Sequence, residues 1–272
     1  MSGAGSGRWE LGDVRAKAAN YKYAAISALT VVALLVLWAI VTSVFSISHL
    51  VLPSPRVMLE EITNLLRIGY SGKALHVHVI ASLLRSLTGL IAGIVLAVPV
   101  GLLMGYSRTF NAVLLPIFGF FRPIPPIAFI PLMILWFGIG ELGKVLLIFA
   151  ASFNYTVLNS AAGMRSVPEQ LIRAGINLGL TRRQLFLSVM LPAAMPHIFT
   201  GIKISTAVSW AIVVAAELIA GQEGLGFIIM DAGTFFRIAD VFLGIIIVGA
   251  IGVSLEIMIS SLERRVLHWQ AK

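Results

Sequence analysis

The chain has 272 residues, of which 58% are hydrophobic and only 12% are charged. Soluble domains carry about 25% charged residues, so this composition excludes a soluble globular enzyme and indicates a protein whose surface largely faces lipid. The net charge of +8 would suggest nucleic-acid binding in a soluble protein. Here the basic residues fall between apolar runs, as in membrane proteins, so no nucleic-acid partner is expected. The lack of cysteine excludes disulfides and thiolate metal sites.

Six apolar runs approach or exceed the roughly 20 residues that a membrane-spanning helix needs. The first, residues 23–45, is longer than the apolar part of a signal peptide and follows an extended basic segment, which favours a retained span. The sequence therefore predicts an all-α membrane protein with about six transmembrane helices. The other five runs are 82–105, 110–138, 143–164, 197–220 and 241–261.

The third of these runs contains Pro123, Pro125, Pro126 and Pro131. Proline removes a hydrogen-bond donor and clashes with the preceding turn, so this run must kink or unwind. Irregular backbone at membrane depth is tolerated only where protein or a water-filled cavity covers it. This segment is therefore expected either inside the bundle or along a pathway.

The basic residues between the spans predict the orientation. With the N-terminus inside, 13 Lys and Arg residues fall in cytoplasmic segments and 5 fall outside. Cytoplasmic loops are enriched in these residues, so both termini are expected in the cytoplasm. The inner set is Arg8, Arg15, Lys17, Lys22, Arg108, Arg165, Arg173, Arg182, Arg183, Lys203, Arg264, Arg265 and Lys272, and the outer set is Arg56, Arg67, Lys73, Lys144 and Arg237.

The second run carries small residues at every fourth position, Gly89, Gly93, Ala97, Gly101 and Gly105. Such a stripe lets another helix approach closely. The partner helix belongs either to another subunit or to the same chain, and packing within the chain is the favoured interpretation.

The longest cytoplasmic connection, residues 165–199, has the pattern of two short amphipathic helices. Val167-Pro168-Glu169 is typical of a helix start. Apolar residues then recur every three to four positions, and a bend is expected at Gly179-Leu180-Thr181. By periodicity alone, docking into a groove of a partner protein and lying flat on the lipid surface fit equally well.

The spacing within this connection resembles the signature loop of ABC-importer permeases. In that loop Glu-Ala-Ala precedes a glycine, and nine residues later come an aliphatic residue, any residue, Leu and Pro. Here Gly179 is followed at that distance by Val189-Met190-Leu191-Pro192, whereas the Glu-Ala-Ala positions read Arg173-Ala174-Gly175 and lack the acid.

The resemblance extends over residues 77–262 and is strongest to the nitrate, sulfonate and taurine branch, with residues 122–141 most similar to taurine permeases. Before that core, residues 51–55 also resemble the family. The matching runs within the core are Arg122-Pro123-Ile124-Pro125-Pro126, Ile130-Pro131-Leu132-Met133, Trp136-Phe137-Gly138-Ile139-Gly140-Glu141, Ala216-Glu217-Leu218-Ile219-Ala220, Gly224-Leu225-Gly226-Phe227 and Ala239-Asp240-Val241.

The resemblance implies a type I ABC-importer permease fold with a coupling loop at about residues 165–196. The expected organisation is a cytoplasmic tail at 1–22, a first helix and external connection at 23–76, the permease core at 77–262 and a second tail at 263–272. Coupling-loop residues would dock on the ATPase, and the basic ones would meet its acidic groups. These residues are Arg173, Ala174, Gly175, Leu178, Gly179, Leu180, Thr181, Arg182, Arg183, Leu191 and Pro192.

The resemblance also implies the partners: two cytoplasmic ATPase subunits, an extracytoplasmic binding protein and a second permease copy, with a homodimer as the simpler arrangement. The chain has no GxxxxGK[ST] phosphate loop, so ATP and Mg²⁺ are expected on the ATPase and no cofactor on this chain.

Transport by alternating access would carry a small organic or inorganic anion, with taurine or another sulfonate as the expected cargo, across a bacterial inner membrane. A stand-alone secondary transporter or channel is the alternative.

Charged residues at membrane depth usually face a bundle interior or a cavity. Arg122 either offers a cation to an anionic substrate or forms a structural pair, and the structural pair is favoured. Glu217 belongs either to an external gate or to a structural hydrogen bond, and Glu256 is expected to be structural. Arg122, Pro125 and Glu217 are the candidate residues of the translocation pathway or gate. His76 and His78 lack a nearby third ligand, so no metal site is expected, and both are interpreted as interfacial or loop residues.

Overall fold

The computed structural model describes residues 6–44 and 48–269. This part of the chain is helical and forms no β-strand. Five helices are long and apolar enough to cross a membrane, and a bent pair of shorter helices can supply a sixth span. The prediction of an all-α membrane protein with about six transmembrane helices is therefore confirmed. The chain divides into two units, Met1–Thr63 and Asn64–Lys272.

The first unit contains one long helix and most of a short one. Helix α1 (Ser6–Val44) includes the apolar segment Ala25–Val44, so the helix begins well before the predicted start of its span. The Trp38 indole nitrogen donates to the carbonyl of Pro53 at 3.1 Å. Helix α2 (Pro55–Arg67) begins on a proline, whose fixed φ suits the first turn of a helix.

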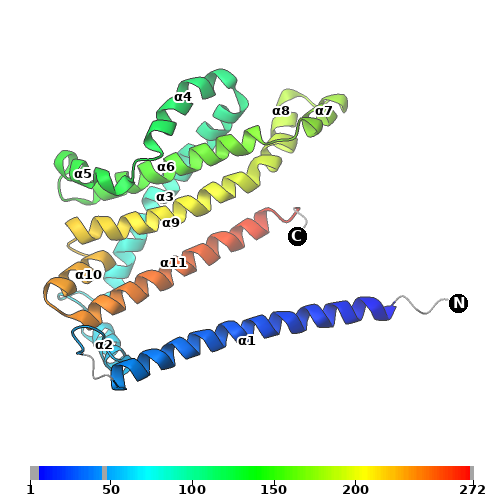
Figure 1. Cartoon of the computed structure of the whole chain (residues 1–272). Helices are drawn as coiled ribbons and strands as arrows, with labels where there is room; N and C mark the ends of the chain where they lie inside the picture. The colour runs from blue at the N-terminus through cyan, green and yellow to red at the C-terminus, as the bar shows by residue number, and fades with distance from the viewer. Residues whose placement is uncertain (1–5, 45–47, 270–272) are drawn as a thin grey trace. The chain divides into compact units, whose positions relative to one another are not determined.

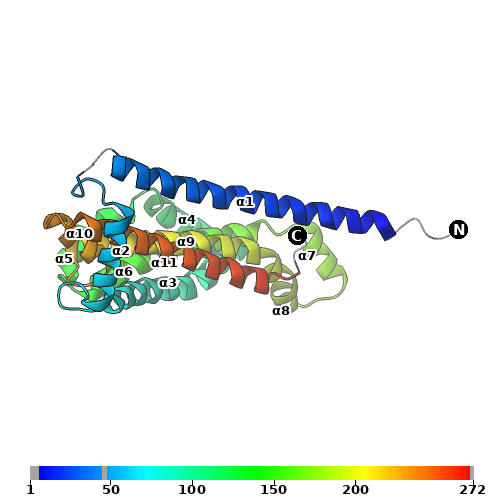
Figure 2. The same ribbon diagram turned by 90° about the horizontal axis from the view of Figure 1, so that it is seen from below.

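The second unit is a bundle in which α6 packs against both α3 and α9, and α10 packs on α9 and α11. Helices α7 and α8 lie at one end of this bundle, hereafter the loop end, and α5 and α10 lie at the other, hereafter the α10 end (Figures 1 and 2). The long helices are α3 (Leu75–Tyr106), α6 (Glu141–Arg165), α9 (Leu191–Ala220) and α11 (Ile238–Val266), and the short one on α9 is α10 (Leu225–Thr234).

The small-residue stripe of α3 packs against α6 of the same chain. A methyl group at Gly93 would lie 1.9 Å from Ser152 Oγ, and one at Gly101 would lie 2.5 Å from the carbonyl oxygen of Val157. Ser152 Oγ also donates to the carbonyl of Gly89 at 3.3 Å. The two backbones are therefore too close for larger residues, and the favoured interpretation of packing within one chain is confirmed.

Replacing Gly93 by alanine is expected to push α3 away from α6 and to lower the unfolding free energy by about 1–3 kcal/mol, as overpacking does in cores. Gly249 is the matched control, because it is also helical but a methyl group added there would have no atom within 4 Å. Gly249→Ala should leave stability unchanged or raise it slightly. Thermal unfolding of the purified protein in detergent measures both, and equal melting temperatures for the two variants would contradict the packing argument.

The third apolar run of the sequence is a broken helix, as its prolines predict. Helix α4 (Arg108–Phe121) and the segment formed by the 3₁₀ helix η1 (Pro126–Phe129) and α5 (Ile130–Phe137) meet at an angle of 83°. Helix α4 starts beside the C-terminal end of α3 and spans only about 21 Å at 1.5 Å per residue, less than the roughly 30 Å of hydrocarbon. A helix of this length that starts at one membrane face would end inside the hydrocarbon, so the break at residues 122–125 is expected at membrane depth.

Candidate functional site

The predicted coupling loop consists of two short helices, α7 (Glu169–Asn177) and α8 (Arg182–Leu185). Between them Gly179 has φ +74°, a conformation that glycine adopts at little cost. The amide of Leu180 donates to the carbonyl of Gly175 at 3.1 Å and that of Gly179 to Ile176 at 2.9 Å, which is a Schellman end to α7. The predicted helices and the bend between them are confirmed.

The second helix of the loop has its own start signal. The Thr181 side chain accepts from the backbone amide of Gln184, and the Gln184 side chain accepts from the backbone amide of Thr181. This reciprocal capping box satisfies two amides that a helix start otherwise leaves unpaired. The Thr-x-x-Gln spacing was present in the sequence and could have been used to place the start of α8.

An apolar cluster holds the loop against the bundle. Val167 and Met190 are buried together with Leu102 of α3 and Met164 of α6. Gly175 of α7 is buried, and a methyl group there would lie 2.6 Å from Leu185 Cδ1 of α8. At the third position of the Glu-Ala-Ala slot, glycine therefore permits a close approach of α7 to α8.

The loop joins α9 through a widened turn. The segment Phe186–Met190 is a π-helix, and the amide of Leu191 donates to the carbonyl of Phe186. Pro192, the second residue of α9, has no amide hydrogen to donate. Leu191 and Pro192 thus lie at the root of the loop, half-buried, rather than on its exposed tip.

The outward face of the loop combines apolar and basic side chains. Leu178 is 81% exposed and Ile176 is 58% exposed. Arg173 forms an exposed ion pair with Glu169, one turn earlier, at 2.8 Å. Arg182 and Arg183 are exposed and have no carboxylate partner among the described residues. Exposed apolar residues at a basic, ordered loop tip are the features expected of a docking surface.

At the α10 end, a buried arginine binds three carboxylates. Arg85 of α3 donates from Nη1 to Glu217 Oε1 of α9 at 2.7 Å and from Nη2 to Glu141 Oε1 of α6 at 2.9 Å. Its Nε also bonds Glu141, and its Nη2 lies 3.5 Å from Glu223. The Arg85 side chain is 4% exposed and that of Glu217 is fully buried. These contacts join α3, α6, α9 and the connection that follows α9.

Gly224 and Gly226 pack closely around the Glu217 carboxylate. The carboxylate accepts hydrogen bonds from the amide of Gly226 at 3.0 Å and from Ser82 Oγ at 2.8 Å. Gly224 has φ +122°, and a methyl group there would lie 2.2 Å from the Glu217 carboxyl carbon. Because Gly224 is also the N-cap residue of α10, the carboxylate lies at the positive end of that helix. The family-like runs at 216–220 and 224–227 therefore form one structural unit.

Further ion pairs and hydrogen bonds link residues at the edge of the α10 end. Lys73 Nζ bonds Glu223 Oε2 at 2.6 Å, and the Lys73 ammonium holds the pKa of the Glu223 carboxyl below its usual range. Tyr70 donates to Asp231 Oδ2 at 2.8 Å. Burial, together with that hydrogen bond, raises the pKa of Tyr70 well above its usual range. Both shifts keep these groups in the forms that make the observed contacts.

The structure corrects the interpretation of His78 and favours one of the two alternatives for Glu217. His78, expected in a loop or at the membrane interface, is fully buried: its Nδ1 accepts from the amide of Gly224 at 3.2 Å, and its Nε2 lies 3.2 Å from the Tyr70 carbonyl. For Glu217 the contacts favour the structural hydrogen bond, while a role at an external gate stays a prediction. In the described part of the chain, no three histidine or acidic side chains are placed so that they could hold a metal ion.

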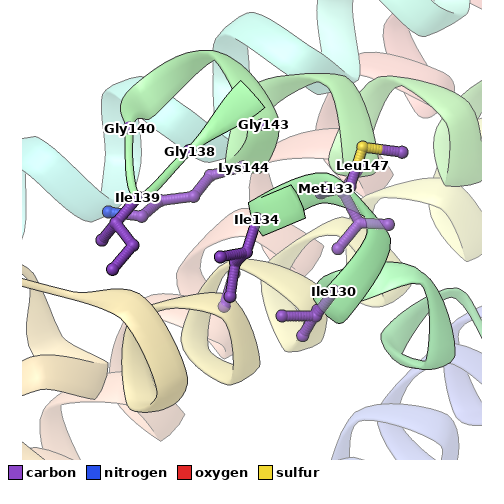
Figure 3. Close-up of a pocket in the computed structure, with 10 residues that line it drawn as sticks. Ile130, Met133, Ile134, Gly138, Ile139, Gly140, Gly143, Lys144 and Leu147 are labelled. Carbon is purple, nitrogen blue, oxygen red and sulfur yellow. The ribbon is translucent and has the colours of Figure 1, made fainter. Parts of the chain in front are cut away.

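A small pocket lies between α5 and the start of α6 (Figure 3). Its volume of about 20 Å³ has room for about one water molecule, so it is too small for a substrate. Its lining includes Ile130, Met133 and Ile134 of α5 and Lys144 of α6. Lys144 is already paired with Glu141 at 3.2 Å.

A larger cavity lies where the broken helix faces α6. Its volume is about 430 Å³, and its lining includes Arg122 and Asn154. Arg122 is exposed, and its side chain has neither an ion pair nor a hydrogen bond within the described residues, so the favoured structural pair is not found. Pro125 is the N-cap residue of η1 and borders the lining residues Ile124 and Pro126. A pathway role for Arg122 and Pro125 remains a prediction.

A third cavity, of about 490 Å³, lies between α9 and α11. Lys203, one of its lining residues, is paired with Glu263. Glu256 is exposed to this cavity and makes no ion pair with any described residue, so the expected structural role has no contact to support it. In this cavity, Glu256 is therefore an acid that no cation of the described chain neutralises.

Comparisons with known proteins match most of the second unit to one family. Residues 79–268 match the family model described as binding-protein-dependent transport system inner membrane component. The taurine transport system permease protein TauC of Escherichia coli (strain K12) is 40% identical over 244 residues, 89% of each chain. The nitrate import permease protein NrtB of a Synechocystis species is 33% identical over 250 residues, 90% of each chain.

Among solved structures, the inward-facing MetNI methionine ABC transporter superposes with a TM-score of 0.61 at 20% identity, over 71% of this chain and 95% of that one. At this identity the similarity concerns the fold, and it supports the predicted type I permease fold.

Proposed function

Because this chain belongs to the family of binding-protein-dependent transport system inner membrane components, we propose that it forms the translocation pathway for a small anion, with taurine or another sulfonate as cargo. Members of the family are permease subunits of ABC importers, not enzymes, and ATP is hydrolysed on a separate subunit. The observation that carries the proposal is the ordered loop α7–Gly179–α8, whose exposed apolar and basic residues suit a cytoplasmic ATPase.

In the proposed complex two copies of this chain bind two ATPase subunits, which hold ATP and Mg²⁺, and an extracytoplasmic protein delivers the anion. The loop end would face the cytoplasm together with both termini, as the basic residues favour. Closure of the ATPases would move α7 and α8, and the bundle anchored to them would alternate between inward-open and outward-open states. The network at the α10 end would keep α3, α6 and α9 together during that movement.

The cargo is proposed from the relatives and from charge. TauC is named for taurine and NrtB for nitrate, and both names denote anions or zwitterions that carry an oxyanion. Arg122, the unpaired cation of the apolar-walled cavity at the broken helix, fits such a cargo. Taurine is favoured over nitrate because the identity to TauC is higher.

Reconstitution tests the proposal. The tagged chain is co-expressed with the ATPase and the binding protein of the same transporter, purified in mild detergent and placed in liposomes. We expect ATPase to co-purify and to drive uptake of labelled taurine, with nitrate and bicarbonate measured in parallel. Transport by the chain alone, without ATP, would overturn the importer assignment in favour of a secondary transporter or channel, and ATP-driven uptake of nitrate alone would correct the cargo.

A further inference from the structure

The imidazole of His78 is enclosed at the α10 end, where the start of α3, the turn before it and α10 meet. The side chain is fully buried. The ring of Phe227 in α10 is stacked on it with centroids 6.0 Å apart, and the Tyr70 ring meets it edge-on at 6.3 Å. We propose that His78 is a pH-sensitive contact: while neutral it holds the connection between α9 and α10 (residues 221–224) against the bundle, and on protonation it releases that connection.

The two ring nitrogens of His78 have fixed roles. A backbone amide only donates, so Nδ1 carries the lone pair that accepts from the amide of Gly224, at 3.2 Å. A carbonyl only accepts, so Nε2, which lies 3.2 Å from the carbonyl oxygen of Tyr70, carries the hydrogen. A second proton would bind to Nδ1, where it would face the Gly224 amide hydrogen and leave that amide without its acceptor. The imidazole is therefore neutral as long as this contact lasts.

The contact lies next to the Glu217 carboxylate. Gly224 is the N-cap residue of α10, and a methyl group added to it would lie 2.2 Å from the Glu217 carboxyl carbon. The next amide, that of Leu225, donates to Ser82 Oγ at 2.9 Å, and this hydroxyl donates to Glu217. Loss of the bond from Gly224 to His78 would therefore free the residue that packs over Glu217, and the start of α10 would lose a contact with α3.

The charged groups of the elements around His78 are paired with one another. Hydrogen bonds from cations and hydroxyls favour the ionised form of the carboxylates, which ordinarily titrate near pH 4, whereas lysine, arginine and tyrosine titrate at about pH 10 or above. Between about pH 5.5 and 7.5, His78 and the exposed His76 are therefore the groups of this end that can titrate. The pairs are Lys73 with Glu223, Arg85 with Glu141, Glu217 and Glu223, Lys144 with Glu141, Tyr70 with Asp231, and Arg237 with Asp240.

The direction of the pH effect follows from the protons that each state binds. Once the contact is broken, the imidazole can bind a proton at the ordinary histidine pKa of about 6.5, whereas the closed connection excludes that proton. Because the open state binds one proton more, falling pH shifts the equilibrium towards it, by up to about tenfold per pH unit below about pH 6. Above about pH 7 the ring is neutral in both states, so the equilibrium no longer depends on pH.

The side of the membrane decides which compartment this contact senses. In the orientation that the basic residues favour, the α10 end faces the extracytoplasmic side. An acidic medium would then loosen the outer end of the bundle, and a neutral medium would keep it closed. This consequence alone rests on the proposed function; the contact and its test in detergent do not.

Thiol labelling of the purified full-length chain measures the opening, because the chain has no cysteine of its own. Leu225→Cys places a thiol at a fully buried position in the first turn of α10, where a pyridyl disulfide reaches it only when the connection opens. Ile68→Cys, at a position that is 80% exposed, gives the reference rate that corrects for thiol reactivity at each pH. Val157→Cys, fully buried in α6, reports opening of the whole bundle.

We expect the labelling rate of Leu225→Cys, relative to that of Ile68→Cys, to rise about tenfold between about pH 7.5 and 5.5, and that of Val157→Cys to stay constant. Adding His78→Gln should keep the first ratio within a factor of about two over this range, because glutamine also offers an acceptor and a donor but does not titrate. His76→Gln is the matched control, since His76 is exposed on the same helix, and it should leave the rise intact.

A flat ratio for Leu225→Cys, or an equal rise for Val157→Cys, would overturn the proposal. So would a rise that persists in His78→Gln or disappears in His76→Gln. The first two comparisons change nothing at His78, so they decide the proposal even where His78→Gln does not fold. A complex that imports an anion with ATP while the labelling ratio stays flat refutes the His78 contact and leaves the importer intact. The expected labelling without any ATP-driven uptake supports the contact and refutes the proposed function.

Discussion

Replacing Glu217 by alanine is expected to lower the unfolding free energy by about 3–5 kcal/mol, the usual effect of removing one partner of a buried ion pair. Arg85 would keep its buried position and lose the carboxylate bonded to Nη1. Ser82 and the amide of Gly226 would lose the same acceptor. Thermal unfolding of the purified chain in detergent measures the loss, and reduced yield of folded protein should accompany it.

Two further variants distinguish the effect of breaking this buried ion pair on stability from the effect of removing a charge elsewhere. Glu60→Gln removes one partner of the ion pair between Arg56 and Glu60, whose side chains are 90% and 65% exposed. Exposed pairs contribute only about 0–1 kcal/mol, so the free energy of unfolding should change little. The double variant Arg85→Met with Glu217→Met removes both buried charges. It should be more stable than Glu217→Ala, in which the buried Arg85 keeps Glu141 and Glu223 but loses its one fully buried partner. An unchanged melting temperature in Glu217→Ala would show that the network does not hold the α10 end together.

Replacing Gly179 by valine is expected to abolish most ATP-driven uptake while the chain still inserts and folds. A β-branched residue at φ +74° is strained, and the strain would disturb the Schellman end of α7. The side chain would also point into open space at the loop tip, since no atom lies within 4 Å of its first carbon. We expect uptake to fall by about tenfold or more, as for a lost interface contact of about 1.4 kcal/mol.

Gly72 provides the matched control for backbone strain. It has φ +77°, and a methyl group added there would likewise have no atom within 4 Å. It precedes α3, away from the coupling loop, so Gly72→Val should introduce similar strain and keep uptake near the wild-type level. Co-purification of the ATPase with each variant identifies the step that fails. Wild-type uptake in Gly179→Val would refute the assignment of this loop as the coupling element.

Local structure could be predicted from short stretches of sequence. Pro168 and Glu169 predicted the start of α7, and Gly179 predicted the bend, because helix caps and left-handed turns depend on neighbouring residues. The prolines at 123–131 predicted the break in the third span for the same reason. The second helix of the loop also carries a local signal, the capping box of Thr181 and Gln184.

The contacts of the charged residues could not be predicted in this way. Arg85 and Glu217 are 132 positions apart in the chain, yet they form the centre of one network. His78 was expected in a loop or at the membrane interface and is buried, and the Arg122 side chain was expected in a pair and has none among the described residues. Nothing in the residues near each of these positions specifies which distant helix supplies a partner.

The sequence by itself determined that this protein lies in a membrane, that its chain crosses about six times and that one loop has the spacing of a coupling element. Those properties follow from hydrophobic length and from local backbone preferences, which act over a few to about 20 residues. Only the tertiary structure decided which charges neutralise one another at the α10 end and which cation, Arg122, has no partner within the described chain beside a cavity. Pairing depends on the packing of α3, α6 and α9, and that packing joins residues far apart in the chain.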